Sequence, residues 1–535
     1  VRTKRGGWLL AIAYVLALGY YLVNLYWLAA VTALGYGGLC VYMACFFVLS
    51  GFILRQIYQK RSRPFTVVLP LVWTAQEYLQ AVVMTGFPWL FLSHSQHESL
   101  RLIQISDLFG AYGVTFLIAM VNGLICDFLL RPLKAITPRQ KKKVSVATLI
   151  LAALCLLLGA VVYGGYRLRQ GAGTMTPGPV IAAIQENIPQ YVKEQAASGE
   201  EIFRRHLQLS EQALQAGVKP ELIVWPETMT CNPLNQEFLD LQRQHPSYDM
   251  SLYSPWVQSQ TFDKQLRELA GQGAAVLVGT PSLLMKEDLG GLAPAGTANS
   301  AVLYLAGGQR FGQRYDKMHL VPFGEVVPFK KSWPWMYRLL NSLTPYDYEY
   351  SLDAGEDPVV FAYPGADGQL RRFAVAICYE DVTPHMPRTL TVEKGQKRID
   401  FLLNISNDGW FVRGGNGKPV TATSELLQHL AICKFRAVEN RIGIVRAVNT
   451  GISGFIRPDG AVQPAGLAGK LPDEPRQRQA VAGFLTDRVY LDTRVSLYSR
   501  MGDWFAIVCC LFSLLFFADS LRKKRPGLAP SAAAR

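Results

Sequence analysis

Three residues in the second half of the chain could together generate a reactive thiolate. Cys378 ends the apolar run "RFAVAIC", Glu227 ends "LIVWPE", and Lys317 lies in the polar stretch "RYDKMHLVPFGE". A carboxylate can act as general base on a thiol, and a lysine ammonium both favours the thiolate and stabilises a developing oxyanion. The types of these three residues therefore predict nucleophilic catalysis by Cys378.

The immediate neighbours of Cys378 argue against a reactive thiol. Glu380 and Asp381 follow it closely, and negative charge nearby raises the pKa of a thiol. Activation must therefore come from residues that are distant in sequence. Each candidate alone also has a plain structural interpretation: a solvated carboxylate, a surface lysine and an inert buried thiol.

Strand-like segments should position these residues. Short β-rich runs alternate with amphipathic stretches such as "EEIFRRHLQLSEQALQ" and "SELLQHLAICKFRAVENR". The runs are "PVIAAIQEN", "ELIVWPE", "GAAVLVGTPS", "SAVLYLA", "FAVAICYED", "FLLNISND" and "IGIVRAVNTG". Nearly continuous apolar strands interleaved with helices predict an α/β domain whose sheet is buried on both faces. Polar groups should collect where the strands end.

The composition also indicates a membrane. Half of the residues are hydrophobic, and no charged residue occurs in residues 6–54 or 144–166. We expect six transmembrane helices, because about 20 apolar residues cross a bilayer. They are predicted at residues 8–30, 36–54, 65–90, 108–130, 144–166 and 502–521, with a tight hairpin turn at "ALGYGG" between the first two.

Basic residues predict the orientation of these helices. They gather in residues 2–5, 55–63, 131–143 and 521–525, while the intervening short loops carry almost none. The positive-inside rule then places both termini in the cytoplasm. The prediction is transmembrane helices in residues 1–166, an outer domain in residues 167–500, and a last transmembrane helix with a basic cytoplasmic tail in residues 501–535. The net charge of +14 is thereby explained without nucleic acid.

Two further features concern metals and the membrane. Cys231, Cys378 and Cys433 lie in the outer domain, where any two could pair, and they are too far apart in sequence to form a Cys-x2–4-Cys zinc motif. We therefore expect no metal site. Glu77 is an acidic residue inside an apolar helix, so it is either a functional group or a buried hydrogen-bonding group.

The motifs "VWPE", "YDKMHLVPFGE", "ICYED" and "NISNDGWF" resemble those of the carbon-nitrogen hydrolase (nitrilase) superfamily. The segments "QEYLQAVVMTGFPWL", "SHSQ", "QISDLFGAYGVTFLIAMVNG" and "IQENIPQ" are similar to its membrane branch, the apolipoprotein N-acyltransferases of bacterial inner membranes. The resemblance implies an αββα sandwich inserted in a multi-pass helical bundle. The chain departs from the family pattern at two points. It has five predicted helices before the enzyme domain instead of seven, and it has Glu194 after "IPQ" where the family often has a nearby Trp.

The resemblance also implies roles for individual residues. Glu227 would be the base, Lys317 the oxyanion-stabilising lysine and Cys378 the nucleophile. The backbone N–H of Tyr379 would be a second oxyanion donor. Glu325 and Glu380 lie where the family has supporting carboxylates, which would orient Lys317 or shape the pocket. The alternative interpretation is that both form ordinary structural ion pairs.

The implied enzyme transfers a fatty acyl chain from the sn-1 position of a phospholipid, through a thioester, to the N-terminal amine of a diacylglyceryl apolipoprotein. It would act as a monomer among membrane lipids, without a cofactor, and with its catalytic domain in the periplasm. The alternatives are a membrane-anchored amidase or nitrilase-type hydrolase with the same three residues, and a non-enzymatic sensor or transporter. An intact trio and a single intramembrane charge favour an enzyme over the last of these.

Overall fold

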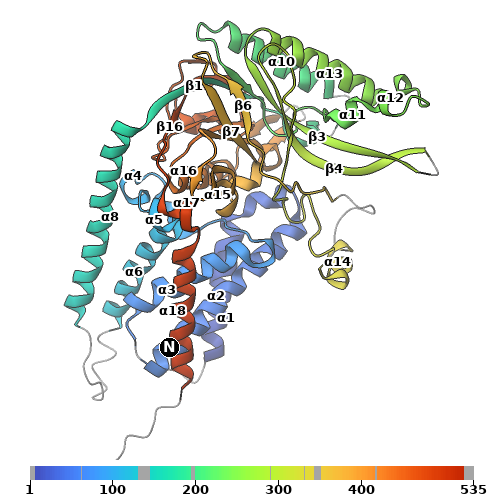
Figure 1. Ribbon diagram of the computed structural model, residues 1–535. Helices are drawn as coiled ribbons and strands as arrows, with labels where there is room; N and C mark the ends of the chain where they lie inside the picture. Colours follow the sequence, from blue (N-terminus) through green and yellow to red (C-terminus); the bar gives the residue numbers. More distant parts are fainter. Residues whose placement is uncertain are drawn as a thin grey trace, which may run out of the picture.

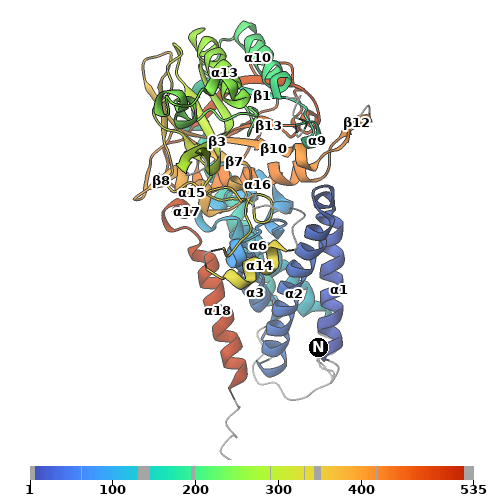
Figure 2. The same ribbon diagram turned by 90° about the vertical axis from the view of Figure 1, so that its right-hand side faces the viewer.

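The computed structural model describes residues 6–61, 63–130, 145–193, 195, 199–288, 291–330, 332–342, 351–415 and 418–522. The basic segments 2–5 and 131–143, most of the basic C-terminal segment and Glu194 lie outside these residues. Within them, long helices extend from one side of a globular α/β part (Figures 1 and 2).

Six of the described helices are long and apolar enough to cross a membrane. They are α1 (Gly6–Asn24), α2 (Ala33–Arg61), α3 (Phe65–Val82), α6 (Ala111–Leu129), α8 (Val146–Thr174) and α18 (Trp504–Leu521). The expected turn at "ALGYGG" is wrong, because residues 33–38 form the first turns of α2, and the chain reverses at residues 25–32. Glycine costs a helix only about 1 kcal/mol, whereas unpaired backbone groups in lipid cost several.

The segment between α3 and α6 is not a simple loop. It contains the short helices η2 (Val83–Thr85), η3 (Leu92–Gln96), α4 (Leu100–Ile103) and α5 (Ser106–Phe109). Glu77 holds it in place, accepting hydrogen bonds from Leu92 N at 2.8 Å, Thr115 Oγ1 at 2.6 Å and Trp73 Nε1 at 3.2 Å. The intramembrane carboxylate is therefore a buried hydrogen-bonding group that joins α3, η3 and α6.

The globular part contains two stacked sheets. The larger has the strand order β15-β16-β1-β2-β3-β4-β5, and the smaller has the order β14-β13-β10-β7-β6. Neighbouring strands are parallel within β1-β2-β3 and within β7-β10-β13. The strands of the larger sheet are β1 (Thr176–Gln185), β2 (Leu222–Val224), β3 (Ala275–Asp288), β4 (Gly291–Tyr304), β5 (Tyr315–Asp316), β15 (Ala468–Gly469) and β16 (Gly483–Leu491); those of the smaller are β6 (Phe361–Pro364), β7 (Leu370–Ile377), β10 (Phe401–Asn407), β13 (Gly443–Asn449) and β14 (Gly454–Ile456).

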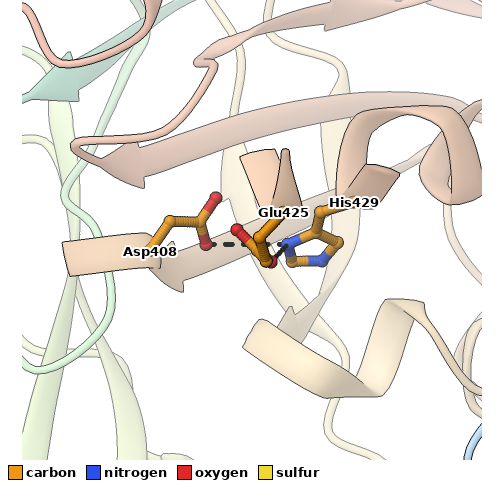
Figure 3. A group of neighbouring side chains, drawn as sticks. All are labelled: Asp408, Glu425 and His429. Atoms are coloured by element: carbon orange, nitrogen blue, oxygen red, sulfur yellow. Dashed lines mark ion pairs between the residues drawn. The ribbon is translucent and has the colours of Figure 1, made fainter. Parts of the chain in front are cut away.

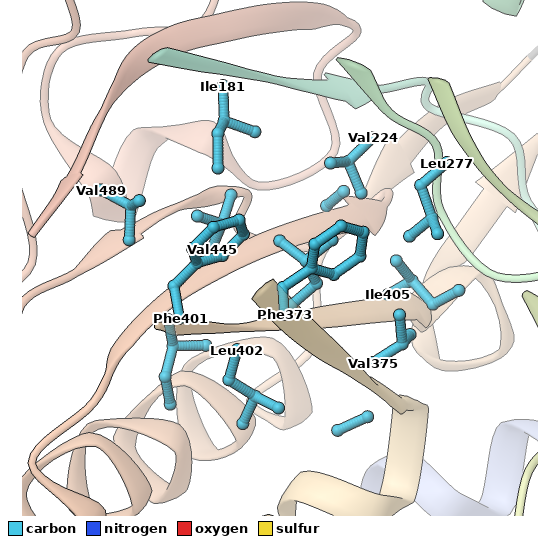
Figure 4. Packing of buried hydrophobic residues seen from close by; sticks show 14 of the residues in the cluster. Ile181, Val224, Leu277, Phe373, Val375, Phe401, Leu402, Ile405, Val445 and Val489 are labelled. Carbon is cyan, nitrogen blue, oxygen red and sulfur yellow. The ribbon is translucent and has the colours of Figure 1, made fainter. Parts of the chain in front are cut away.

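Apolar side chains fill the space between the sheets. Ile181, Val224 and Leu277 of the larger sheet meet Phe373 and Phe401 of the smaller one (Figure 4). The other face of the larger sheet packs on α10 (Gly199–Gln215) and α13 (Ser254–Gly271), and that of the smaller sheet packs on α15 (His385–Thr391) and α16 (Glu425–Asn440). These four layers confirm the predicted αββα sandwich, and all seven predicted strand runs contain a strand.

A buried ion-pair network attaches the sandwich to the membrane helices. Asp107 in α5 pairs at 2.6 Å both with Arg441, which follows α16, and with Arg167 in α8. Tyr163 of α8 donates a hydrogen bond to Asp107 at 2.8 Å. Because buried charges are tolerated only when they are paired, this network fixes how α16 sits on the membrane part.

Candidate active site

Cys378 lies at the point where β7 ends and the short helix η6 (Cys378–Asp381) begins. Its backbone has φ +52°, in the left-handed region, which costs a residue with a Cβ roughly 1–2 kcal/mol. The half-buried Cys378 thus lies where the chain turns out of the carboxyl end of β7. Such strain in a non-glycine residue is typical of functional sites.

Glu227 follows β2 of the opposite sheet. Its Oε1 accepts from Asn299 Nδ2 at 2.7 Å and its Oε2 accepts from the backbone N–H of Asn407 at 2.9 Å, so the carboxylate bridges both sheets. Gly279 in β3 permits this position, because a Cβ there would lie 2.3 Å from Pro226 O and 2.7 Å from Glu227 Cα. Only glycine lets β3 pass this close to the turn that carries Glu227.

Lys317 follows β5 and has no exposed surface. Its Nζ lies 2.8 Å from Glu325 Oε2 and 3.4 Å from Glu227 Oε1. Glu325 also accepts from Val321 N at 2.8 Å and Asn299 Nδ2 at 3.0 Å, so Asn299 joins the two carboxylates. Glu325 is thus close enough to orient Lys317, and this role stays a prediction.

The three candidates influence one another electrostatically. Burial, with the Glu227 carboxylate next, raises the pKa of the Cys378 thiol well above its usual value, and Lys317 opposes this. Burial disfavours the Lys317 ammonium, but Glu325 and Glu227 outweigh it and raise the pKa of Lys317. A charged lysine beside a thiol that is protonated at rest suits proton removal at the moment of attack.

Glu380 and Tyr379 shape the surroundings of the thiol. Glu380 accepts from Tyr315 OH at 2.8 Å and from the backbone N–H groups of Met318 at 2.7 Å and Ile377 at 2.7 Å. It thereby fastens the loop of Lys317 to the turn of Cys378, and burial raises the pKa of Glu380 to about 7. The hydrogen bonds of Glu380 go to Tyr315 and to backbone N–H groups, whereas the Lys317 ammonium donates to Glu325 and Glu227.

The membrane part reaches the site through residues 86–92. Tyr379 donates a hydrogen bond to Gly86 O at 3.1 Å, and its ring stacks on Phe87 with centroids 6.3 Å apart. Trp89 Nε1 donates to Gln428 Oε1 of α16 at 2.6 Å. The residue after the candidate nucleophile therefore contacts the segment that Glu77 anchors.

Close ion-pair contacts join five buried ionisable side chains for which the sequence predicted no role. They are Asp381, Asp408, Glu425, His429 and Arg446, which we call the buried charge cluster. Asp408, Glu425 and His429 lie close enough to offer one atom each to a metal ion (Figure 3). Two signals could have revealed the cluster: the polar end of "NISND", and the i, i+4 spacing of Glu425 and His429 on one helix face.

The cysteines differ in their surroundings. All nine are among the described residues, and none forms a disulfide. Cys231 is exposed, whereas Cys433 is buried in α16. Cys378 is the described cysteine on which the charges of both Glu227 and Lys317 act.

Comparisons with known proteins agree with these features. Residues 2–124 match the apolipoprotein N-acyltransferase N-terminal domain, and residues 180–470 match the carbon-nitrogen hydrolase family. The chain is 32% identical to an apolipoprotein N-acyltransferase of Geobacter metallireducens, over 93% of this chain and 82% of the relative. It is 29% identical to apolipoprotein N-acyltransferase 2 of Treponema pallidum (87% and 77%) and 28% identical to the Chlorobaculum tepidum enzyme (94% and 86%).

These matches confirm the resemblance found in the motifs. The relatives are named as acyltransferases, the carbon-nitrogen hydrolase domain is enzymatic, and the six apolar helices make the chain a multi-pass membrane protein. The chain therefore belongs to the apolipoprotein N-acyltransferases, an enzyme family of the membrane branch of the carbon-nitrogen hydrolases.

Proposed function

We propose that the protein transfers the sn-1 acyl chain of a phospholipid to the N-terminal amine of a diacylglyceryl apolipoprotein, with a thioester on Cys378 as intermediate. The observation that carries the proposal is the contact between Tyr379 and the membrane segment at Gly86 and Phe87. It supports the proposal because Gly86 and Phe87 directly follow the third helix that is long and apolar enough to cross a membrane. Both substrates carry acyl chains, so a site at the bilayer surface suits them.

The first step forms the acyl-enzyme. Glu227 takes the thiol proton as the sulfur of Cys378 attacks the ester carbonyl, and Lys317 with the backbone N–H of Tyr379 stabilises the oxyanion. The carbonyl–oxygen bond to glycerol then breaks. The lysophospholipid alkoxide takes the proton from Glu227 and leaves as an alcohol, and a thioester remains.

The second step transfers the acyl chain. The lipoprotein amine attacks the thioester carbonyl, and Glu227 accepts one of its protons. The carbon–sulfur bond breaks, an amide forms, and the proton returns to the Cys378 thiolate. The same residues from both sheets thus serve both half-reactions. The covalent intermediate divides one difficult transfer into two easier steps.

The same proposal fixes the placement in the cell. Residues 167–500 would lie in the periplasm, both termini in the cytoplasm, and residues 1–166 and 501–521 in the inner membrane. The basic residues 55–63 support this orientation through the positive-inside rule. The protein would act as a monomer, because the three candidate residues come from a single chain.

The acyl-enzyme provides the test. Purified protein incubated with phospholipid alone should gain one fatty-acyl mass on the peptide that contains Cys378, and neutral hydroxylamine should remove it. Cys378→Ala should abolish both this mass and acyl transfer to lipoprotein, while Cys231→Ala should keep most of the activity. An acyl mass on another residue would refute the proposal, and release of the acyl chain to water in the presence of lipoprotein would favour the hydrolase.

A further inference from the structure

The buried charge cluster is linked to Cys378 by a short chain of contacts. Ser406 follows Ile405, the strand partner of Ile377, so it lies beside Cys378, and its hydroxyl donates to Asp408 Oδ1 at 2.7 Å. The negative charge of Asp408 also acts directly on the thiol and disfavours its ionisation. Whatever neutralises Asp408 therefore affects how easily Cys378 loses its proton.

His429 is the central member of the cluster. Its Nε2 lies 2.7 Å from Asp381 Oδ1. Its Nδ1 lies 3.5 Å from both Asp408 Oδ1 and Glu425 Oε1, as Figure 3 shows. Carboxylates thus face both ring nitrogens, an arrangement that suits an imidazolium with two N–H donors. Trp89 lies on the membrane side of the ring, with centroids 5.8 Å apart.

Arg446 supplies the second cation. Its Nη1 lies 3.1 Å from Asp381 Oδ2, and its Nη2 lies 3.9 Å from Asp408 Oδ2. With His429 charged and Glu425 protonated, two carboxylates face two cations and the cluster is neutral. Neutrality matters here because all five side chains are buried, where an uncompensated charge is strongly unfavourable.

The electrostatics of the individual groups agree with this balance. Burial disfavours the His429 imidazolium, but Asp381 outweighs it and raises the pKa of His429 to about 10. Burial, with the charge of Asp408 next, raises the pKa of Glu425 well above its usual value, which favours the protonated form that this balance needs. Cys433 of the same helix also contacts this network and stays protonated, since burial raises its pKa.

We propose that His429 is a positioning residue of the acyl transfer, which holds Asp408 and compensates its charge so that Cys378 can ionise. The proposal rests on the proposed role of Cys378 as nucleophile. His429 acts through Asp408 and Ser406 and does not touch the substrate. It complements Lys317, which acts on the thiol from the opposite sheet.

A divalent cation is the competing explanation of the same cluster. It would replace the two protons on His429 and Glu425 and give the same total charge. Arg446 argues against it, because its guanidinium already faces Asp408 and would repel a second cation at this position. A protonated Glu425 needs no negative charge, so glutamine can replace it, whereas a metal-bound carboxylate cannot be replaced in this way.

The test measures how fast iodoacetamide alkylates Cys378 between pH 7 and 10, by mass spectrometry of its peptide in the full-length detergent-solubilised protein. The charged groups that face this thiol are Glu227, Lys317 and Asp408. Of these three, only Asp408 loses a neighbouring positive charge when His429 is replaced. His429→Gln should slow alkylation about tenfold at pH 8, which corresponds to a thiol pKa about one unit higher. Formation of the acyl-enzyme should slow to a similar extent.

Removal of the Asp408 charge separates this effect from structural damage. Asp408→Asn should speed alkylation, because the charge that opposes ionisation is gone, and the double variant His429→Gln/Asp408→Asn should return towards the wild-type rate. Damage to the fold would accumulate in the double variant instead of cancelling. If His429→Gln does not fold, Asp408→Asn alone decides. The proposal is then overturned if Asp408→Asn does not speed alkylation.

Two controls complete the design. Glu425→Gln should leave the alkylation profile unchanged, and His206→Gln, which removes an equally buried imidazole from α10, should do so as well. An unchanged rate in folded His429→Gln, an effect of Glu425→Gln as large as that of His429→Gln, or one bound zinc per chain by elemental analysis would each overturn the proposal. Alkylation needs no lipid, so these results are independent of whether Cys378 forms an acyl-enzyme.

Discussion

At the scale of residues, Lys317 is the most constrained member of the site. It has no exposed surface and its ammonium lies between Glu227 and Glu325. The alternative interpretation of Lys317 as a surface charge is wrong, because the αββα sandwich encloses it. The charges of two carboxylates that are far apart in sequence keep it protonated.

We expect Lys317→Arg to lose at least about 100-fold in the rate of acyl-enzyme formation, comparable to the loss of an oxyanion donor. Arginine keeps the charge but replaces a compact ammonium by a broad planar fork, which does not fit between the two carboxylates. The rate is measured by mass spectrometry of the Cys378 peptide. The matched control is Lys264→Arg on exposed α13, and near-normal turnover of Lys317→Arg would show that only diffuse positive charge is needed.

At the scale of elements, the site depends on how closely two strands approach. Glu227 follows β2, and the neighbouring β3 passes within reach of its backbone only because residue 279 is glycine. Asn407, at the end of β10 in the other sheet, then donates its backbone N–H to Glu227. The position of the candidate base is thus determined by strand packing in both sheets.

Gly279→Ala should reduce the rate of acyl-enzyme formation at least about tenfold. It should also lower the free energy of unfolding by about 1–3 kcal/mol, the usual cost of overpacking. The added methyl would push Glu227 away from Lys317 and Asn407. Gly271→Ala, at the end of α13 with nothing within 4 Å of the new Cβ, is the control and should be neutral or slightly stabilising. Equal activity of both variants would show that the approach of β3 does not position Glu227.

At the scale of the whole molecule, buried polar contacts connect the membrane helices to the sandwich. Asp107 pairs with Arg441, and Glu77 anchors the segment whose Trp89 bonds to Gln428 next to His429. The helix α16 therefore contacts the membrane part at both of its ends. Contacts at both ends of α16 thus join the sandwich that carries the site to the membrane helices.

The orientation of the whole molecule can be tested by labelling. A membrane-impermeant amine reagent applied to spheroplasts should modify exposed lysines such as Lys264 within residues 167–500 and spare residues 141–143. Permeabilised spheroplasts serve as the control in which both become labelled. Modification of residues 141–143 with Lys264 protected would invert the proposed topology.

The sequence alone determined the class of the molecule. Apolar length gives the transmembrane helices, and alternation of strands and helices gives the α/β domain, because both depend on local patterns of burial. The motifs around Glu227, Lys317 and Cys378 gave the family and the candidate trio. Local glycines were misleading at "ALGYGG", where the demand of lipid for paired backbone groups outweighs their weak helix propensity.

Only the tertiary structure decided which polar groups face one another. Asn299 joins Glu227 to Glu325 across strands, and His429 lies between Asp381 and Asp408, although these residues are far apart in the chain. Periodicity places a residue on a face of its own element but says nothing about which face of another element it meets. The charge of a buried group depends on those partners, so the protonation of Cys378, Glu425 and His429 follows from packing and not from local sequence.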